Sequence, residues 1–293
     1  MACVLITGTS KGIGLATALA FGRAGHRVFA TMRDPARCWE LGEMAAREGL
    51  PIHVSAMDVD SDASVAEGIA AIADQAGPID VLVNNAGIAP AGALEELAMT
   101  DIKAVMETNY FGAVRCMKAV APAMRERRSG CVINVTSIAG QVSTSPLGAY
   151  AASKFALEAV SEAFAQEMKM FGVRVAIVQP GIIDTPMAHG IGDVGDDSPY
   201  PQRRRFAHLF AAALKTPTPP SLVAEKILEI AESGTWQFRH PVGPNAAATM
   251  AGRRATPDAE YIALHGADDE TWYSVMEAQL GRVIRPGMTG NRG

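Results

Sequence analysis

The chain begins with a short apolar segment, a glycine-rich turn and an apolar helical pattern, in that order. Residues 3–7 (CVLIT) are apolar and rich in β-branched side chains, which predicts a buried parallel strand. Gly8, Gly12 and Gly14 follow, and residues 15–21 (LATALAF) have helical spacing. Glycine permits positive φ and close approach to a pyrophosphate, and a helix N-terminus attracts its charge. The segment predicts a dinucleotide cradle rather than a plain strand-to-helix turn, although its spacing is G-x-x-x-G-x-G, not G-x-G-x-x-G.

Other strand-like segments also end in small or polar residues. Residues 79–83 (IDVLV) precede residues 84–87 (NNAG), and residues 131–136 (CVINVT) precede Ser137. Pro180-Gly181 follows a third apolar run. In open α/β sheets, ligands bind beyond the carboxyl ends of the strands. These turns are therefore predicted to converge with the glycine turn on one edge of a sheet.

A tyrosine and a lysine lie four residues apart, at Tyr150 and Lys154, and Ser137 precedes the tyrosine by thirteen residues. Positions i and i+4 share one helix face, so the phenol and the ammonium project side by side. A nearby cation favours phenolate, which predicts a tyrosine pKa below about 10. Such a tyrosine can exchange a proton with an alcohol or ketone oxygen, which the Ser137 hydroxyl would hold. Alone, the pair is more typical of a solvated helix surface, and the N-terminal cradle favours the catalytic interpretation.

Taken together and in order, these motifs resemble the short-chain dehydrogenase/reductase family over about residues 1–190. The matching positions are Thr7-Gly8-x-x-x-Gly12-x-Gly14, Asp58-Val59, Asn84-Asn85-Ala86-Gly87, Asn109, Ser137, Tyr150-x-x-x-Lys154 and Pro180-Gly181-x-x-x-Thr185.

The resemblance implies a Rossmann-type doubly wound α/β fold and a role for each matching residue. Tyr150 would be the general acid/base, Lys154 would lower its pKa and hold the nicotinamide ribose, and Ser137 would orient the substrate oxygen. Asn109 would anchor a water that connects Lys154 to solvent, whereas Asn84 is expected to be structural. The implied cofactor-binding set is Gly8, Ser10, Lys11, Gly12, Ile13, Gly14, Arg33, Asp58, Val59, Asn85, Ala86, Gly87, Tyr150, Lys154, Pro180, Gly181, Ile183 and Thr185.

Composition excludes several other classes of protein. The net charge of −5 provides no basic footprint for nucleic acid, and no apolar run is long enough to span a membrane. The first predicted strand leaves no room for a signal peptide. The four cysteines are scattered, which predicts reduced thiols and a cytoplasmic protein, and the six histidines form no metal-binding pair.

The 293 residues are predicted to form one Rossmann-type domain, with a substrate lid at about 185–220 and an extension at about 241–293. Hydrophobic content of 48% is ample for a large core. Residues 287–293 are expected to be mobile. Parallel strands are expected near 3–7, 27–31, 52–57, 79–84, 131–136, 173–179 and 235–240, and helices near 12–24, 35–48, 61–76, 100–127, 150–171 and 221–233.

The end of the second strand favours NADP(H) over NAD(H). An acid there would bind both ribose hydroxyls, but the strand ends in Met32, and Arg33 is suited to a 2′-phosphate. Lys11 is a second candidate cation. Asp34 is the competing acid, although Asp34-Pro35 is typical of a helix cap followed by the first helical residue.

The region after Thr185 is expected to meet the substrate, a small and largely apolar ketone or alcohol. Residues 186–193 are predicted to be a flexible glycine-rich segment. One apolar helix stripe follows. Its pattern is equally consistent with a helix that packs on the core and with a lid that covers an apolar pocket. Its members are Phe206, Leu209, Phe210, Ala213 and Leu214. Residues 203–205 (RRR) are more typical of a solvated face than of an anion site, and Trp236, Trp272 and Tyr273 suit a pocket or a subunit interface.

Two other functions are compatible with the fold. A cofactor-free lyase such as a halohydrin dehalogenase would replace the lysine with arginine and lose the glycine turn. This chain keeps Lys154 as well as Gly8, Gly12 and Gly14, which argues against a lyase. A silent NADP(H) sensor or scaffold would lose part of the Ser/Tyr/Lys set, which is intact. A homodimer or homotetramer is expected through the helices near 100–127 and 150–171, which carry apolar residues on more than one face. Those residues are Ala113, Met117, Val120, Ala121, Met124, Phe155, Leu157, Ala159, Phe164 and Met168.

Overall fold

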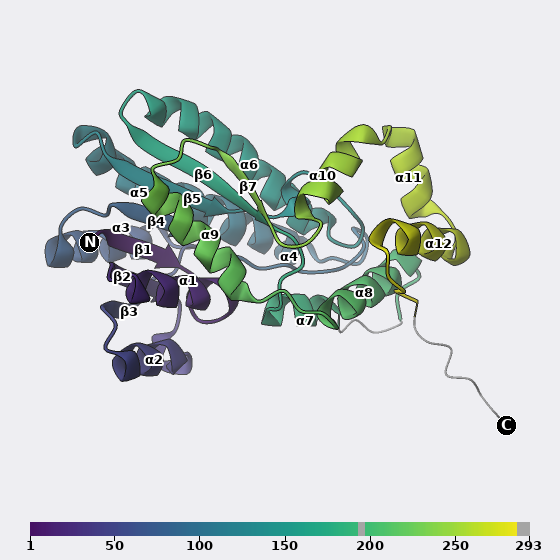
Figure 1. Cartoon of the computed structure of the whole chain (residues 1–293), viewed down its shortest axis with the longest axis horizontal. Coiled ribbons are helices and arrows are strands. Elements are labelled where there is room, and N and C mark those ends of the chain that lie inside the picture. Colours follow the sequence, from purple (N-terminus) through teal and green to yellow (C-terminus); the bar gives the residue numbers. More distant parts are fainter. Residues whose placement is uncertain (193–196, 286–293) are drawn as a thin grey trace.

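In the computed structural model, which describes residues 1–192 and 197–285, seven parallel strands form one sheet in the order β3-β2-β1-β4-β5-β6-β7 (Figure 1). This confirms the doubly wound sheet. The mobility expected for residues 287–293 lies outside the described residues. The strands are β1 (Cys3–Thr7), β2 (Arg27–Met32), β3 (Ile52–Ala56), β4 (Val81–Asn84), β5 (Gly130–Val135), β6 (Val173–Pro180) and β7 (Arg239–Val242).

Apolar side chains fill both faces of the sheet, because helices cover each face. One core lies under α1 (Gly12–Arg23), α2 (Glu40–Glu48) and α9 (Pro220–Ser233). The other lies under α3 (Asp62–Ala76), α5 (Gly112–Glu126) and α6 (Gly148–Lys169). β1 pairs with β2 on one side and β4 on the other, so the strand order reverses beside β1. A ligand crevice is expected at this switch point, beyond the carboxyl ends of the strands.

Three predicted elements differ from the structure. The last strand begins at Arg239 rather than 235, because residues 235–237 form a turn in which Gln237 N donates to Thr235 Oγ1 (3.1 Å). The helix predicted over 35–48 is divided into a 3-10 turn, Pro35–Arg37, and α2. The helix predicted over 100–127 consists of α4 (Met99–Met106), a π-helical segment η2 (Glu107–Phe111) and α5.

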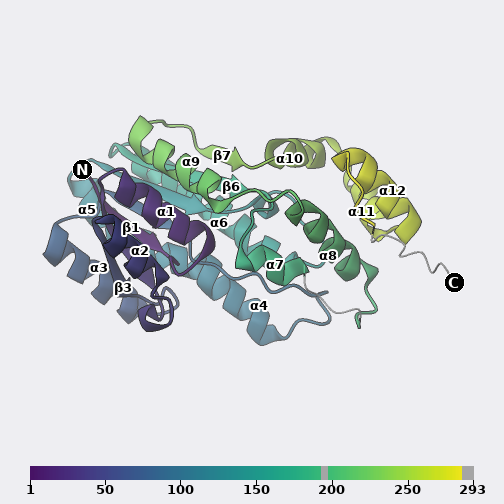
Figure 2. The same ribbon diagram turned by 60° about the horizontal axis from the view of Figure 1, so that its bottom comes forward.

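After β6 the chain is mainly helical, both before and after the last strand, β7. The segment after Thr185 forms α7 (Pro186–Gly192), which corrects the flexible segment predicted there, and α8 (Pro201–Leu214) follows. Beyond β7, α10 (Ala246–Ala255), α11 (Asp258–Gly266) and α12 (Asp269–Leu280) form an arch that extends away from the sheet, and α12 packs on α8 (Figures 1 and 2).

Candidate active site

The glycine turn is shaped for a ligand that contacts the backbone. Gly8 and Gly12 have φ of 69° and 59°, which side chains other than glycine rarely adopt. A Cβ at Gly8 would lie 2.6 Å from Ala86 Cα, and one at Gly14 would lie 2.2 Å from the Gly8 carbonyl oxygen. The structure therefore leaves no room for side chains here, and α1 presents its N-terminus at the turn.

Side chains from β1 and the loop after β4 fix the shape of this turn. Asn85 Nδ2 donates to the carbonyl oxygens of Thr7 and Gly8, both at 3.0 Å. The Thr7 hydroxyl accepts from the backbone N–H groups of Asn85 (3.0 Å) and Ala86 (3.1 Å). The Asn85 amide is thus engaged in holding the turn. Asn84, expected to be structural, is buried and donates to Asn134 Oδ1 at 2.8 Å.

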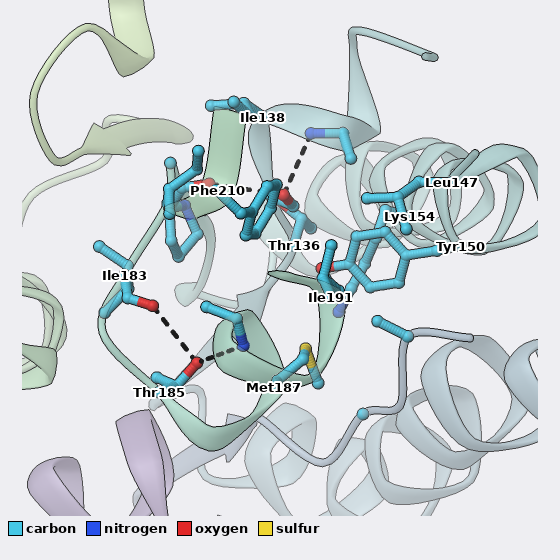
Figure 3. Close-up of a pocket in the computed structure, with 18 of the residues that line it drawn as sticks. Thr136, Ile138, Leu147, Tyr150, Lys154, Ile183, Thr185, Met187, Ile191 and Phe210 are labelled. Carbon is cyan, nitrogen blue, oxygen red and sulfur yellow. Dashed lines mark hydrogen bonds between the residues drawn. The ribbon is translucent and has the colours of Figure 1, made fainter. Parts of the chain in front are cut away.

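Tyr150 and Lys154 lie side by side in the cavity (Figure 3), and Ser137 lines the same cavity at the carboxyl end of β5. Ser137 directly follows β5, while Tyr150 and Lys154 lie one turn apart on α6. The Lys154 Nζ donates to the Val135 carbonyl oxygen at 2.9 Å and lies 5.7 Å from the centroid of the Tyr150 ring. The Ser137 hydroxyl accepts from Ala139 N at 3.1 Å. All three residues line one cavity, as predicted.

The pKa of the tyrosine does not have the predicted direction. Burial raises the pKa of Tyr150 to about 12, against a smaller opposing effect of its hydrogen bond with Ser137. Burial also lowers the pKa of Lys154 to about 8. The same low-dielectric surroundings therefore disfavour both charges. The neutral phenol that results is the form that can donate a proton.

Asn109 lies in the π-helical segment, a distortion often found at functional sites. Its Oδ1 accepts from Ile88 N (2.8 Å), and its Nδ2 donates to Ile88 O and to Ser153 Oγ, both at 2.9 Å. Asn109 is buried, and its partner Ser153 directly precedes Lys154 on α6. These bonds fix the loop after β4 against α6, and the predicted water relay stays a prediction.

Two exposed cations line this part of the cavity, Arg33 at the end of β2 and Lys11 in the glycine turn, whereas the acid beside Arg33 already accepts hydrogen bonds from the backbone. Asp34 Oδ1 accepts from Ala36 N (3.1 Å) and Arg37 N (3.3 Å) and caps the 3-10 turn, as predicted. Arg33 and Lys11 are exposed, line the cavity and form no ion pair within the described residues. Met32 is only 4% exposed and packs in the core. Asp58 and Val59 line the same end of the cavity.

The loop after β6 crosses the cavity opposite the glycine turn. Thr185 Oγ1 donates to the Ile183 carbonyl oxygen (3.3 Å) and accepts from Ala188 N (3.2 Å), which orders the start of α7 (Figure 3). A Cβ at Gly12 would lie 3.2 Å from Thr185 Cγ2. Pro180, Gly181, Ile183 and Thr185 all line the cavity, together with Ser10, Lys11, Ile13, Asn85, Ala86 and Gly87.

The apolar stripe of α8 lines the cavity and also packs against its neighbours, and its role as a lid stays a prediction. Phe206, Leu209, Phe210 and Ala213 line the cavity, and Phe210 packs beside Tyr150 with Leu147 and Ile191. The solvated face expected for residues 203–205 is found at Arg204, which is exposed, but not at Arg205. Arg205 is 2% exposed, and its Nε donates to Asp269 Oδ1 at 2.6 Å, which fastens α8 to α12.

The sequence reasoning missed the contribution of the C-terminal extension. Tyr261 of α11 shares a hydrogen bond with the Thr144 hydroxyl (3.0 Å) and donates to the Ser143 carbonyl oxygen (3.1 Å). Arg254 of α10 donates to Gln141 Oε1 at 2.8 Å. The only signal was the aromatic content of the extension: Trp272 is buried and lines the cavity, whereas Trp236 is exposed beneath Lys169.

Lys154→Met is expected to stabilise the fold below pH 8. The folded-state pKa of Lys154, about 8, lies below its unfolded value, so the folded protein is penalised for charging it at lower pH. The gain should be roughly 3 kcal/mol below pH 8 and should fade as pH rises from 8 to the unfolded pKa of about 10.4. Urea unfolding of both proteins at pH 6 and pH 10 measures this. A variant that is less stable at pH 6 would contradict it.

The model of the short chain dehydrogenase family matches residues 2–194. Two relatives have similar sequences: 3-ketodihydrosphingosine reductase from Bacteroides thetaiotaomicron is 40% identical over 182 residues, and retinol dehydrogenase 8 from Bos taurus is 43% identical over 187. Each alignment covers 62% of this chain, and it spans 64% and 59% of the respective relatives. A solved structure of actinorhodin polyketide ketoreductase with NADPH superposes with a TM-score of 0.74 at 30% identity, covering 84% of this chain and 97% of that one.

The seven-stranded parallel sheet, with the glycine turn and the Ser/Tyr/Lys cluster at the carboxyl ends of its strands, defines a doubly wound α/β protein with one large cavity at that edge. The chain belongs to the short-chain dehydrogenase/reductase family. Within the described residues no helix is long and apolar enough to cross a membrane, and no cluster of potential metal ligands is found.

Proposed function

We propose that this protein transfers a hydride between NADP(H) and the carbonyl or alcohol carbon of a largely apolar substrate. The observation that carries the proposal is the single cavity shared by the glycine turn, the exposed cations at the end of β2 and the Ser/Tyr/Lys cluster. The turn fits a dinucleotide, because any Cβ at Gly8 or Gly14 would collide with backbone. When bound, the nicotinamide would supply the hydride.

The residues of the chain would perform the proton transfer and the positioning. The Tyr150 phenol is neutral, so it can donate a proton to the oxygen of a carbonyl that is being reduced. Ser137 would donate a hydrogen bond to that oxygen, since its hydroxyl already lies beside Tyr150. Lys154 would compensate the charge left on the phenolate. Leu147, Ile191 and Phe210 surround the phenol with apolar surface and exclude water from it.

The direct test is consumption of NADPH during reduction of a panel of apolar ketones and aldehydes. Turnover that needs NADPH or NADH favours the oxidoreductase over the cofactor-free lyase. Tight NADPH binding without turnover of any member would favour the sensor or scaffold alternative.

Arg33→Ala is expected to shift the cofactor preference from NADPH toward NADH. Removing a charge-assisted partner of a 2′-phosphate costs about 1–3 kcal/mol, roughly 5- to 150-fold in the ratio of kcat/KM values. Arg37→Ala is the matched control, because Arg37 pairs with Asp34 and lies outside the cavity lining. Introducing Asp at Met32 is a poorer test, since it would bury a carboxylate in the core. A wild-type preference for NADH would overturn the assignment and favour Asp34.

We retain the homodimer or homotetramer as a proposal, with a corrected surface. Met117, Val120, Met124, Leu157 and Met168 are buried within the chain and are unavailable to a partner. Two aromatic side chains remain exposed on these helices, Phe111 (45%) and Phe155 (43%). Light scattering at micromolar concentration should give a molar mass two or four times the 30.8 kDa of one chain. A mass of one chain would refute the proposal.

The cytoplasmic location stays a prediction from the four unpaired cysteines.

A further inference from the structure

The cavity that contains Tyr150 continues well beyond the Ser/Tyr/Lys cluster. Its volume is about 1370 Å³, above the roughly 300–1,000 Å³ of common single-ligand pockets. One part is lined by the glycine turn and the ends of β2 to β4, where the dinucleotide would bind. The other part is lined by residues of α8 and of α10 to α12. This second part we call the distal subsite.

Two apolar helix faces build the distal subsite. Leu209 and Ala213 of α8 continue the wall that Phe206 and Phe210 begin beside Tyr150. Trp272, Met276 and Leu280 of α12 have i, i+4, i+8 spacing, so they form one stripe. This stripe runs for about 12 Å, at 1.5 Å per residue along the helix axis.

Polar side chains also line the distal subsite, among them His265, Gln279 and Arg282, and two others are held by the protein itself. Arg253 Nη2 donates to Asp258 Oδ1 (2.6 Å), and its guanidinium lies 4.4 Å from the Tyr261 ring centroid. The Tyr261 hydroxyl is bound to Ser143 and Thr144. Among the described lining residues, the carboxylates Asp58 and Asp60 belong to the dinucleotide end. The distal subsite therefore combines the apolar walls of α8 and α12 with neutral or basic polar groups, and no carboxylate lies among its described lining residues.

Resting on the function proposed above, we propose that the C-terminal extension binds a long apolar arm of the substrate. The substrate class is a carbonyl compound whose reactive carbon lies at Tyr150 and whose extended hydrocarbon chain lies along the walls that α8 and α10 to α12 give the cavity. This replaces the small substrate expected from the sequence. The extension thereby acts as a specificity element rather than as a passive cover.

A series of methyl ketones from butanone to tetradecanone tests the length of this subsite. Each methylene that becomes buried should raise kcat/KM by about two- to fourfold, until the arm fills the subsite. Ala213→Phe, which fills the α8 wall, should lower the ratio of kcat/KM for tetradecanone to that for butanone at least tenfold. Ala211→Phe is the matched control, since Ala211 is exposed on the same helix outside the lining. This control should leave the ratio unchanged.

Equilibrium binding provides a readout that needs no turnover. Tetradecanol should change the tryptophan fluorescence saturably in the wild type, and Trp272→Phe should remove that change because Trp272 lines the subsite. Butanone turnover with a flat chain-length series would overturn the distal subsite and leave the proposed function intact. Saturable tetradecanol binding without ketone turnover would support the subsite and refute the oxidoreductase. Equal effects of Ala213→Phe and Ala211→Phe would also overturn the subsite.

A buried acid on α6 carries a second inference, independent of the cavity. Glu158 lies one turn beyond Lys154 and is 5% exposed. Its carboxylate accepts from Thr136 Oγ1 (3.3 Å), Gln141 Nε2 (3.2 Å), Gln179 Nε2 (2.6 Å) and Arg239 Nε (3.4 Å). Thr136 directly precedes Ser137, Gln141 ends the turn after it, and Gln179 directly precedes Pro180-Gly181.

We infer that Glu158 is a positioning residue that fixes the Ser137 turn and the Pro180-Gly181 turn against the helix bearing Tyr150. Glu158→Gln should lower kcat at least tenfold while the Kd for NADPH changes less than twofold. Glu162→Gln is the matched control, because Glu162 also pairs with Arg239 but is 51% exposed and should keep the wild-type kcat.

Exchanging Glu158 and Gln179 distinguishes a positioning role of Glu158 from a role in stabilising the fold. The double variant Glu158→Gln, Gln179→Glu restores a carboxylate–amide pair at the same place and should recover at least a third of the lost kcat. Three outcomes would overturn the inference. The first is a wild-type kcat in Glu158→Gln, and the second is an equal loss of kcat in Glu158→Gln and Glu162→Gln. The third is a loss of kcat that accompanies a lower Tm and is not recovered in the double variant.

Discussion

Tyr150→Phe is expected to lower kcat by about 100- to 10,000-fold, the range attributed to a positioned general acid. The change removes the exchangeable proton and little else, because the ring keeps its packing against Leu147 and Phe210. The dinucleotide end of the cavity is untouched, so the Kd for NADPH should change less than about twofold. Stopped-flow kinetics and a binding titration on the same preparation measure both quantities.

Tyr110→Phe is the matched control for this prediction. Tyr110 lies in the π-helical segment, packs edge-on against Phe111 and is outside the cavity lining. Its loss of a hydroxyl should leave kcat within about twofold of the wild type, as for substitutions away from special features. If Tyr150→Phe kept most of the wild-type rate on a verified substrate, the proton-transfer role would be refuted.

Gly14→Ala is expected to abolish dinucleotide binding. The new Cβ would lie 2.2 Å from the Gly8 carbonyl oxygen and 2.5 Å from Asn85 Nδ2. Both neighbours are fixed, so the turn must move and lose the backbone geometry that accepts a pyrophosphate. We expect the Kd for NADPH to rise at least a hundredfold, and the melting temperature to fall because the amide of Asn85 is displaced from the turn.

Gly42→Ala makes the identical change in another helix. No heavy atom lies within 4 Å of the new Cβ in α2, and Gly42 is not among the glycines with positive φ. Alanine should stabilise that helix by up to about 1 kcal/mol and leave NADPH binding unchanged. Unimpaired binding in Gly14→Ala, measured by calorimetry, would show that the turn is not the cradle.

The sheet and the catalytic cluster were predictable because their signals are local. Continuous apolar strands and glycines at fixed spacing identify β1 and its turn, and the spacing of Tyr150 and Lys154 places both on one face of α6. The Asp34 cap was also predictable, since Asp-Pro at a helix start has a local hydrogen-bonding cause.

The remaining features depend on contacts between residues far apart in the chain. Burial of Arg205 requires Asp269, sixty-four positions away, so its neighbours in the sequence suggested only a charged surface. The raised pKa of Tyr150 depends on how completely helices α7 and α8 cover it, whereas the i, i+4 rule considers only Lys154. The distal subsite joins α8 to α12, and neither stripe alone identifies the other as its partner.

The bonds from Tyr261 and Arg254 to residues 141–144 have a consequence for engineering of this protein. The extension is not a detachable module, because it is fastened to the loop that leads from Ser137 into α6. A chimera that imports another enzyme's C-terminal helices must therefore import a compatible 141–144 loop with them. Transplanting the tail alone would exchange one wall of the cavity and, at the same time, loosen the segment that follows Ser137.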